Sequence, residues 1–104
     1  MKRLDNLRST KDRIICVSEP NTLCFYYQPV GSGERIFLFR SKAFNATVFN
    51  HFRKMGRRAP ERGYSLTIGE LYSFRKDNPR LLQTINHIFL VLRSLLQDED
   101  CRSA

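Results

Sequence analysis

The sequence predicts an α+β domain, with a three-stranded antiparallel meander followed by three helices packed on the sheet. Up to residue 40, apolar side chains come in short β-branched or aromatic runs separated by turn residues. After Ser41 the apolar side chains recur at 3.6-residue spacing, which is typical of amphipathic helices. Strands followed by helices favour a small sheet with helices layered on it. The chain has 104 residues, 41% of them hydrophobic, so one folded domain is expected.

Three strands are expected near residues 13–17, 23–28 and 35–40. Their sequences are RIICV, LCFYYQ and RIFLFR, and the segments SEPNT and PVGSGE between them carry turn chemistry. If SEPNT is a five-residue turn, the facing pairs between the first two strands include Val17 with Leu23 and Cys16 with Cys24. The second hairpin is then expected to place Tyr27 opposite Ile36, Tyr26 opposite Phe37 and Phe25 opposite Leu38.

Alternation along these strands divides their apolar side chains between two faces of the sheet. One face is expected to hold Leu23, Phe25, Tyr27, Ile36 and Leu38. The other face is expected to hold Cys24, Tyr26, Phe37 and Phe39. Antiparallel sheets usually leave one face in water, so the second face is either covered as well or presents its rings to a partner.

The first helix is expected over residues 42–55. Ser41 is positioned to cap its N-terminus, and Gly56 is a natural residue to end it. Apolar side chains at i, i+4, i+8 and i+11 indicate one buried face. These side chains are Phe44, Val48, Phe52 and Met55.

Two further helices are expected over residues 67–75 and 79–97. Thr67 and Glu70 have the spacing of a capping box, in which each side chain satisfies a backbone N–H near the helix start. Asn78 before Pro79 predicts the start of the last helix. Aliphatic side chains then recur at 3.6-residue spacing as far as residue 96.

These elements divide the chain into three parts. Residues 1–12 are expected to be a polar N-terminal arm, residues 13–97 a single α+β domain, and residues 98–104 an acidic frayed tail. A signal peptide has an apolar run after its charged first residues, and this sequence has none. No stretch is long and apolar enough for a membrane span. A cytoplasmic protein with reduced cysteines is therefore expected.

The sequence shows no pattern typical of catalysis. The two histidines, His51 and His87, stand inside predicted helices with no nucleophile motif around them. The three cysteines have no C-x-x-C spacing, and there is no glycine-rich phosphate-binding motif. We therefore expect no enzymatic activity, no cofactor and no metal.

The most unusual segment is FRKMGRRAPERG, residues 52–63. Its first residues are expected to end the first helix, and the rest is expected to be a loop. Only Glu61 opposes its cations, which are Arg53, Lys54, Arg57, Arg58 and Arg62. Arg35 and Arg40 flank the same region in the predicted sheet. Guanidinium groups bind phosphate through paired hydrogen bonds, so this set is a candidate nucleic-acid-binding surface. The alternative is a solvated loop whose charges suit the end of a helix.

The rings of Tyr26, Phe37 and Phe39 form a second candidate site. Exposed rings on a sheet flanked by arginine can stack on unpaired bases. The alternatives are that these rings belong to the core or to an interface with another subunit.

The net charge of +8 favours anionic partners. The first functional hypothesis is a non-enzymatic protein that binds DNA or RNA, mostly through backbone phosphates. The second is a protein-interaction module that binds an acidic partner surface, such as an inhibitory or accessory protein of a phage or mobile element. Two apolar sheet faces and the apolar last helix also predict a homodimer.

Overall fold

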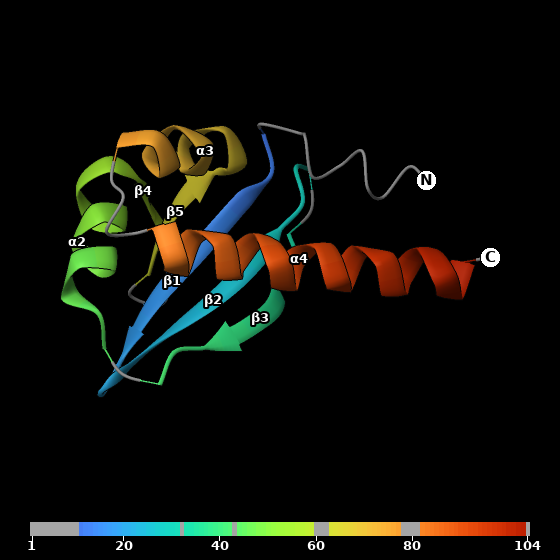
Figure 1. The fold of residues 1–104 in the computed structure, drawn as a ribbon, viewed down its shortest axis with the longest axis horizontal. Helices are drawn as coiled ribbons and strands as arrows, with labels where there is room; N and C mark the ends of the chain where they lie inside the picture. Colours follow the sequence, from blue (N-terminus) through green and yellow to red (C-terminus); the bar gives the residue numbers. More distant parts are fainter. Residues whose placement is uncertain (1–10, 32, 43, 60–62, 78–81, 104) are drawn as a thin grey trace.

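The computed structural model describes residues 11–31, 33–42, 44–59, 63–77 and 82–103. The described part of the chain forms one antiparallel sheet of five strands with three helices (Figure 1). In chain order the elements are β1 (Arg13–Glu19), β2 (Thr22–Gln28), β3 (Ile36–Arg40), α2 (Ala46–Met55), β4 (Arg57–Ala59), β5 (Gly63–Thr67), α3 (Ile68–Asp77) and α4 (Leu82–Ser103). In the sheet the strands lie in the order β3-β2-β1-β5-β4.

The α+β class is confirmed, but the prediction of a three-stranded meander is wrong. The connection predicted between the first two helices contains β4 and all of β5 except Thr67, and β5 pairs with the side of β1 that β2 leaves open. An unpaired edge beside the core would leave backbone N–H and C=O groups without partners, and β5 supplies those partners. The alternation of polar and apolar residues in GYSLT is a strand signal, which the surrounding arginines and glycines obscured.

The turn between β1 and β2 is shorter than expected. Glu19 pairs with Thr22, so only Pro20 and Asn21 form the turn, and Asn21 has a φ of 67°. Asparagine tolerates this left-handed conformation better than most residues. The register is therefore one residue away from the predicted one. Cys16 pairs with Phe25 and Val17 pairs with Cys24.

The second hairpin agrees with the prediction at one end only. The pairs of Tyr27 with Ile36 and of Tyr26 with Phe37 are confirmed. Next to them the register shifts, and Phe25 pairs with Phe39 in place of Leu38. A bulge of this kind adds one residue to one strand, so it breaks the alternation on which the prediction depended.

The bulge moves Phe39 to the face opposite the one predicted for it. Leu38 is buried in the main core and Phe39 packs against the same core. The rings of Phe25 and Phe39 stack with their centroids 4.8 Å apart. The remaining predicted members of this face, Leu23, Tyr27 and Ile36, lie in or against the core as expected.

The cap predicted for α2 is wrong. Helix α2 begins at Ala46, and Asn45 is its N-cap, with Asn45 Oδ1 accepting a hydrogen bond from the Val48 backbone N–H at 3.1 Å. Ser41 instead extends the sheet. Its backbone N–H donates to the Leu23 carbonyl at 2.8 Å, and its Oγ accepts from the Leu23 N–H at 2.9 Å.

The capping box at the start of α3 is confirmed. The Glu70 N–H donates to Thr67 Oγ1 at 3.2 Å, and the Thr67 N–H donates to Glu70 Oε1 at 2.8 Å. The predicted start of the last helix at Asn78 and Pro79 lies outside the described residues.

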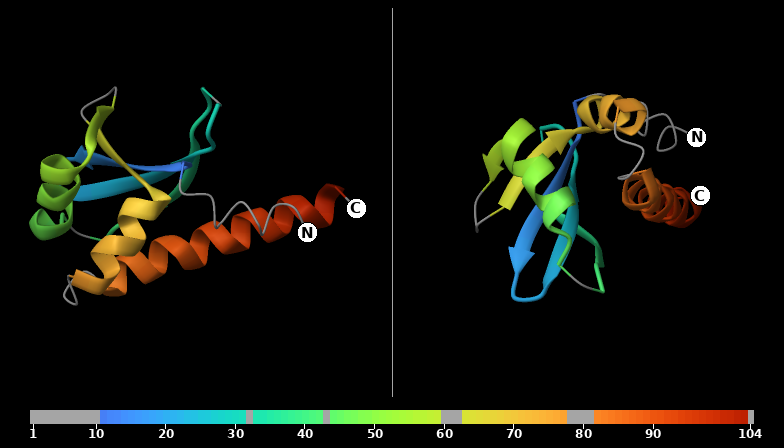
Figure 2. Two further views of the ribbon diagram at one scale, coloured as in Figure 1. Left: turned by 90° about the horizontal axis from the view of Figure 1, so that it is seen from above. Right: turned by 60° about the vertical axis from the view of Figure 1, so that its left-hand side comes forward.

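Helix α4 is longer than predicted, since it continues from residue 97 to Ser103 through the segment expected to be a frayed tail. The acidic residues there oppose the helix dipole, but that effect is worth only about 0.3–1 kcal/mol per charge. The segment contains no glycine or proline that would end the helix. Its C-terminal part extends beyond the sheet (Figures 1 and 2).

All three helices pack on the same face of the sheet (Figure 2). The core between them contains Ile14, Leu23 and Phe25 from the sheet, Phe52 from α2, Ile68 and Leu71 from α3, and Ile88 and Leu92 from α4. On the opposite face, the described residues form a smaller cluster, and all of its members come from strands. Its members are Ile15, Val17 and Cys24, with Tyr26 and Ala59 packed against them.

Asp12 belongs to the folded domain, although we predicted it within the polar arm. Its side chain is only 3% exposed. Asp12 Oδ2 accepts a hydrogen bond from Tyr27 OH at 2.8 Å, and Oδ1 accepts from the Val30 N–H at 2.8 Å. Its carbonyl accepts from the Ile68 N–H at 2.8 Å. Residue 12 therefore joins the start of β1 to β2 and to the start of α3. Lys11 of the predicted arm is also described, and residues 1–10 lie outside the described part.

Candidate functional site

The sheet face that the helices leave open is the first candidate site, and we call it the open face. Strand register aligns five of its residues across the whole sheet. This row consists of Phe37, Tyr26, Ile15, Ser65 and Arg57, one from each strand. It begins with two aromatic rings and ends with a guanidinium. None of the described helices packs against the row (Figure 2).

Ser65 brings two arginines together on the open face. Arg13 Nε donates a hydrogen bond to Ser65 Oγ at 2.8 Å, and Arg13 Nη2 donates to the Ser65 carbonyl at 3.3 Å. Arg57 is the cross-strand partner of Ser65 on the other side. Side chains paired in this way have Cβ atoms about 4.5–5.5 Å apart. Arg13 and Arg57 therefore extend from neighbouring positions on either side of one nearly buried serine.

A basic pocket adjoins Arg13 at the end of the sheet where β2 leads into the β2–β3 connection. Its volume is about 330 Å³, and Lys11, Arg13, Gln28 and residues 29–31 line it. These lining residues include two cations and no carboxylate. The pocket therefore favours an anionic group, which two cationic side chains can contact from one side.

Arg40 supplies a third cation on the open face, at the opposite edge of the sheet. Arg40 Nε donates to Cys24 Sγ at 3.4 Å, and Arg40 Nη2 lies 3.5 Å from Glu19 Oε2. The Cys24 hydrogen bond and the Cys24 and Glu19 charges raise the pKa of Arg40 above its usual value. Arg40 and Arg57 lie on the two edge strands, which in a five-stranded sheet are roughly 19 Å apart. The cations thus span the width of the sheet.

Two of the three predicted platform rings share the open face. Tyr26 and Phe37 contact each other edge to face, with their centroids 5.6 Å apart, and Phe37 is 52% exposed. Phe39 is not part of this surface, because the bulge in β3 places it against the helix-covered core.

The cations of the predicted basic segment do not form one patch. Arg53 and Lys54 lie in the last turn of α2, on the helix side of the sheet. Arg57 and Arg58 are successive residues of β4, so their side chains point to opposite faces, and only Arg57 belongs to the open face. Arg62 lies outside the described residues. Arg35 is half-buried just before β3.

Sequence reasoning missed Lys11, Arg13 and Ser65. Alternation along RIICV already places Arg13 on the same face as Ile15 and Val17. That signal could have identified Arg13 as a surface cation beside the rings. Its position next to Arg57 could not be inferred, because it depends on the pairing of β1 with β5.

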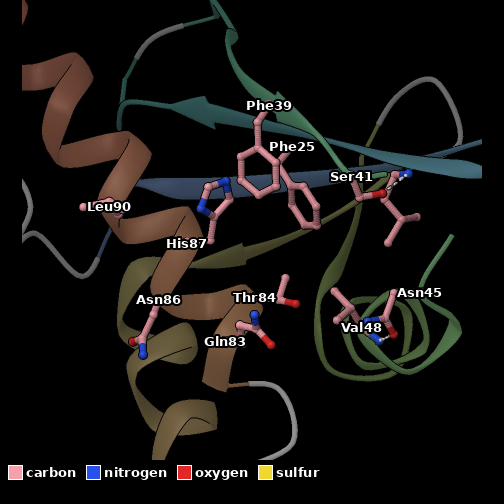
Figure 3. A pocket seen from close by; sticks show the side chains of 11 residues that line it. Phe25, Phe39, Ser41, Asn45, Val48, Gln83, Thr84, Asn86, His87 and Leu90 are labelled. Atoms are coloured by element: carbon pink, nitrogen blue, oxygen red, sulfur yellow. Dashed lines mark hydrogen bonds between the residues drawn. The ribbon is translucent and has the colours of Figure 1, made fainter. Parts of the chain in front are cut away.

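A second cavity lies on the other side of the sheet, between α2 and α4 (Figure 3). Its volume is about 450 Å³. The partly exposed Phe39 ring lines its floor and stacks on the fully buried Phe25 ring, and the His87 ring meets Phe39 edge to face at a centroid distance of 4.4 Å. Polar side chains of α4, namely Gln83, Thr84, Asn86 and His87, form one wall. His87 was not predicted to be part of any site.

The remaining titratable groups offer little chemistry. Burial raises the pKa of the Cys16 thiol, aided by Cys24, so this sulfur is not a thiolate nucleophile at neutral pH. Burial and then the charge of Lys54 lower the pKa of His51. Among the described residues, no group of three or more His, Cys, Asp or Glu side chains is positioned to hold a metal ion. None of the described helices has the length and hydrophobicity to cross a membrane.

Comparison with protein-family models, curated proteins and solved structures gives no match for this chain. The class that the structure defines is therefore an α+β domain with one helix-covered sheet face and one open, basic and aromatic face.

Proposed function

We propose that this protein binds single-stranded nucleic acid on the open face of its sheet. The observation that carries the proposal is the row from Phe37 through Tyr26 and Ser65 to Arg57, with Arg13 bonded to its serine. A nucleotide strand has bases and phosphates, and this uncovered surface has rings and guanidinium groups that suit them. The rings suit unpaired bases, and the guanidinium groups suit the phosphates.

The charges of the open face favour a polyanion. Arg13, Arg40 and Arg57 come from three strands, and the Glu19 carboxylate lies beside Arg40. The other described acidic groups include Asp12, bound by Tyr27, and Glu70, bound in the capping box. Phosphates would relieve the repulsion among the arginines and accept charge-assisted hydrogen bonds from them.

The rings favour a single strand over a duplex. A base can stack on Phe37 only if it is not enclosed between its neighbours in a helix, and the exposed half of the Phe37 ring is available for such a contact. Phosphate contacts alone would not distinguish the two forms. A protein partner with an acidic surface is the competing hypothesis, and it requires no preference for single strands.

The experiment is a salt titration of oligonucleotide binding by fluorescence anisotropy, with wild type and two single variants. Arg57→Gln removes a cation from the open face. Arg58→Gln removes the neighbouring cation, which is equally charged and also exposed, from the opposite face of β4. The probes are a labelled oligothymidine of about 20 nucleotides and a duplex of the same length.

We expect wild-type affinity for the single strand to exceed that for the duplex and to fall between about 50 and about 200 mM salt. Arg57→Gln should reduce the slope of log affinity against log salt by about 0.7, the value for one phosphate contact with a single strand. Arg58→Gln should change the slope by clearly less. If the wild-type and Arg57→Gln curves coincide, the open face does not bind nucleic acid, and the protein-interaction hypothesis takes its place.

A further inference from the structure

The cavity between α2 and α4 is a second site, separate from the open face because the sheet lies between them (Figures 2 and 3). Its volume of about 450 Å³ is within the range of small-molecule sites, which is roughly 300–1,000 Å³. It has an apolar floor and a polar wall, a combination typical of ligand pockets.

The floor of the cavity is aromatic. Phe25 and Phe39 stack at 4.8 Å with an interplanar angle of 25°, and His87 meets Phe39 at an angle of 77°. Leu23 and Val48, which are almost fully buried, also line the cavity. Ring faces and ring edges prefer other rings, in offset-stacked or edge-to-face contact. The exposed parts of Phe39 and His87 therefore favour a flat, aromatic guest.

The wall of the cavity carries side chains that both donate and accept hydrogen bonds. Gln83, Thr84 and His87 come from the first turns of α4, and Figure 3 shows Thr84 and His87 beside the Phe25 and Phe39 rings. Amide, hydroxyl and imidazole groups have this dual capacity. A hydrocarbon guest would bury these polar groups without partners, which is unfavourable.

The described part of the cavity lining carries no fixed charge, although the whole chain has a net charge of +8. The eleven described residues that line it include no Lys, Arg, Asp or Glu. A phosphate or carboxylate would lose its hydration there without gaining a counter-charge. The described lining therefore favours an uncharged, planar and aromatic guest with donors and acceptors along its edge.

From these three properties we propose that the cavity binds the nucleobase ring of a free nucleoside. Nucleobases are flat, uncharged heteroaromatic rings whose edges alternate hydrogen-bond donors and acceptors. A base within a nucleotide strand is the other possible source of such a ring. The free molecule fits better, because the cavity and the arginines of the open face lie on opposite sides of the sheet. The site would stand even if the open face bound no nucleic acid.

The test is an NMR titration of the isotope-labelled protein with adenosine, guanosine, cytidine and uridine. We expect at least one nucleoside to shift the signals of Phe39, Thr84 and His87 saturably. A dissociation constant on the order of 0.1 mM is expected for a ligand of about 19 non-hydrogen atoms at ordinary ligand efficiency. The corresponding 5′-monophosphate should bind no more tightly than the nucleoside, because the lining offers no cation to its phosphate.

Two variants of α4 form a matched pair for this titration. Gln83→Ala removes a polar group from the wall. Gln97→Ala also removes an exposed glutamine side chain from α4, but at a position outside the cavity. We expect Gln83→Ala to weaken nucleoside binding about fivefold, as for the loss of one neutral hydrogen bond. Gln97→Ala should leave nucleoside binding unchanged. Thr84→Phe should fill the cavity and abolish the shifts.

Four results would overturn the proposal. One is the absence of saturable shifts with all four nucleosides at millimolar concentration in the folded wild-type protein. The second is equal weakening by Gln83→Ala and Gln97→Ala. The third is the same set of shifts with an oligonucleotide but not with free nucleosides, which would make the strand the source of the base. The fourth is tighter binding of N-acetyl-tryptophanamide than of any nucleoside, which would indicate an aromatic side chain of a protein partner.

Discussion

The Arg13 Nε atom lies 2.8 Å from Ser65 Oγ, although 52 residues separate the two in the chain. This hydrogen bond extends the Arg13 side chain across β1 toward β5, where Arg57 is the next cross-strand neighbour of Ser65. Arg13 loses part of its rotamer freedom in this contact before any ligand arrives. An ordered guanidinium costs less entropy when it binds a phosphate.

Ser65→Ala should therefore weaken binding of the oligothymidine by about twofold to fivefold, because Arg13 would have to be ordered by the ligand. Stability should fall by about 0.5–1.5 kcal/mol, as for one hydrogen bond. Anisotropy and urea unfolding measure the two effects. Ser73→Ala is the control, since Ser73 Oγ donates to the Gly69 carbonyl on the exposed surface of α3. Similar binding by both variants and wild type would show that the Arg13 contact is structural only.

Phe37→Ser should reduce affinity for the single strand by about 5- to 150-fold, because stacking of one base on an aromatic side chain is worth about 1–3 kcal/mol. Met55→Ser is the matched control, because Met55 is also 52% exposed but lies at the end of α2. Anisotropy at fixed salt measures both. An equal loss with the two variants would contradict a stacking role for Phe37.

Gly56→Ala should destabilise the fold by about 1–3 kcal/mol, as overpacking does. A Cβ at residue 56 would overlap the Ser65 carbonyl oxygen and lie 2.6 Å from the Phe52 carbonyl oxygen, so the junction between α2 and β4 would have to move. Thermal unfolding measures the loss as a lower Tm. Gly33→Ala is the control, since nothing lies within 4 Å of a Cβ there. An unchanged Tm for Gly56→Ala would mean that this junction adapts freely.

The stability of the protein should depend on the protonation of His51. Burial and then Lys54 lower the His51 pKa in the folded chain below the unfolded value of about 6.5. As the pH falls, the unfolded chain therefore binds a proton first. The stabilising contribution is present above about pH 6.5 and is lost as the pH falls toward the lower folded pKa.

Between about pH 7.5 and about pH 5.5, wild type should thus lose more stability than His51→Gln. Urea unfolding of both proteins at the two pH values measures the difference, and other titrating groups cancel in the comparison. Parallel losses would show that the surroundings of His51 do not disfavour its charge.

The homodimer stays a prediction. The open face around the half-exposed Phe37 ring is the surface most suited to form the dimer interface. We expect light scattering at tens of micromolar to give twice the mass of one chain, and Phe37→Ser to shift the mass toward that of the monomer. An excess of oligothymidine should also reduce the dimer, since both would cover the same rings. A monomer mass for wild type at these concentrations would refute the prediction.

Local sequence patterns predicted most of the elements whose contacts lie within one segment, but they missed the local β4–β5 hairpin. The positions of β1, β2 and β3, the capping box of Thr67 and Glu70, and the pairing of Tyr26 with Phe37 follow from side-chain period and turn residues. The apolar spacing also identified Val48 and Phe52 as buried, but it was wrong for Phe44 and Met55, which are exposed. These features depend on residues that are neighbours along one strand, one helix or one hairpin.

Only the tertiary structure decided which side chains lie on the same surface. The pairing of β4 with β5 places Arg57 and Arg58 on opposite faces, and the pairing of β5 with β1 brings Ser65 to Arg13. Together these pairings make an open basic face from residues that local periodicity treats separately. The bulge in β3 moves Phe39 from the open face to the floor of the cavity with His87. The physical reason is that strand pairing is a contact between distant segments, set by the backbone hydrogen bonds and packing of the whole domain, and a side-chain period describes one segment only.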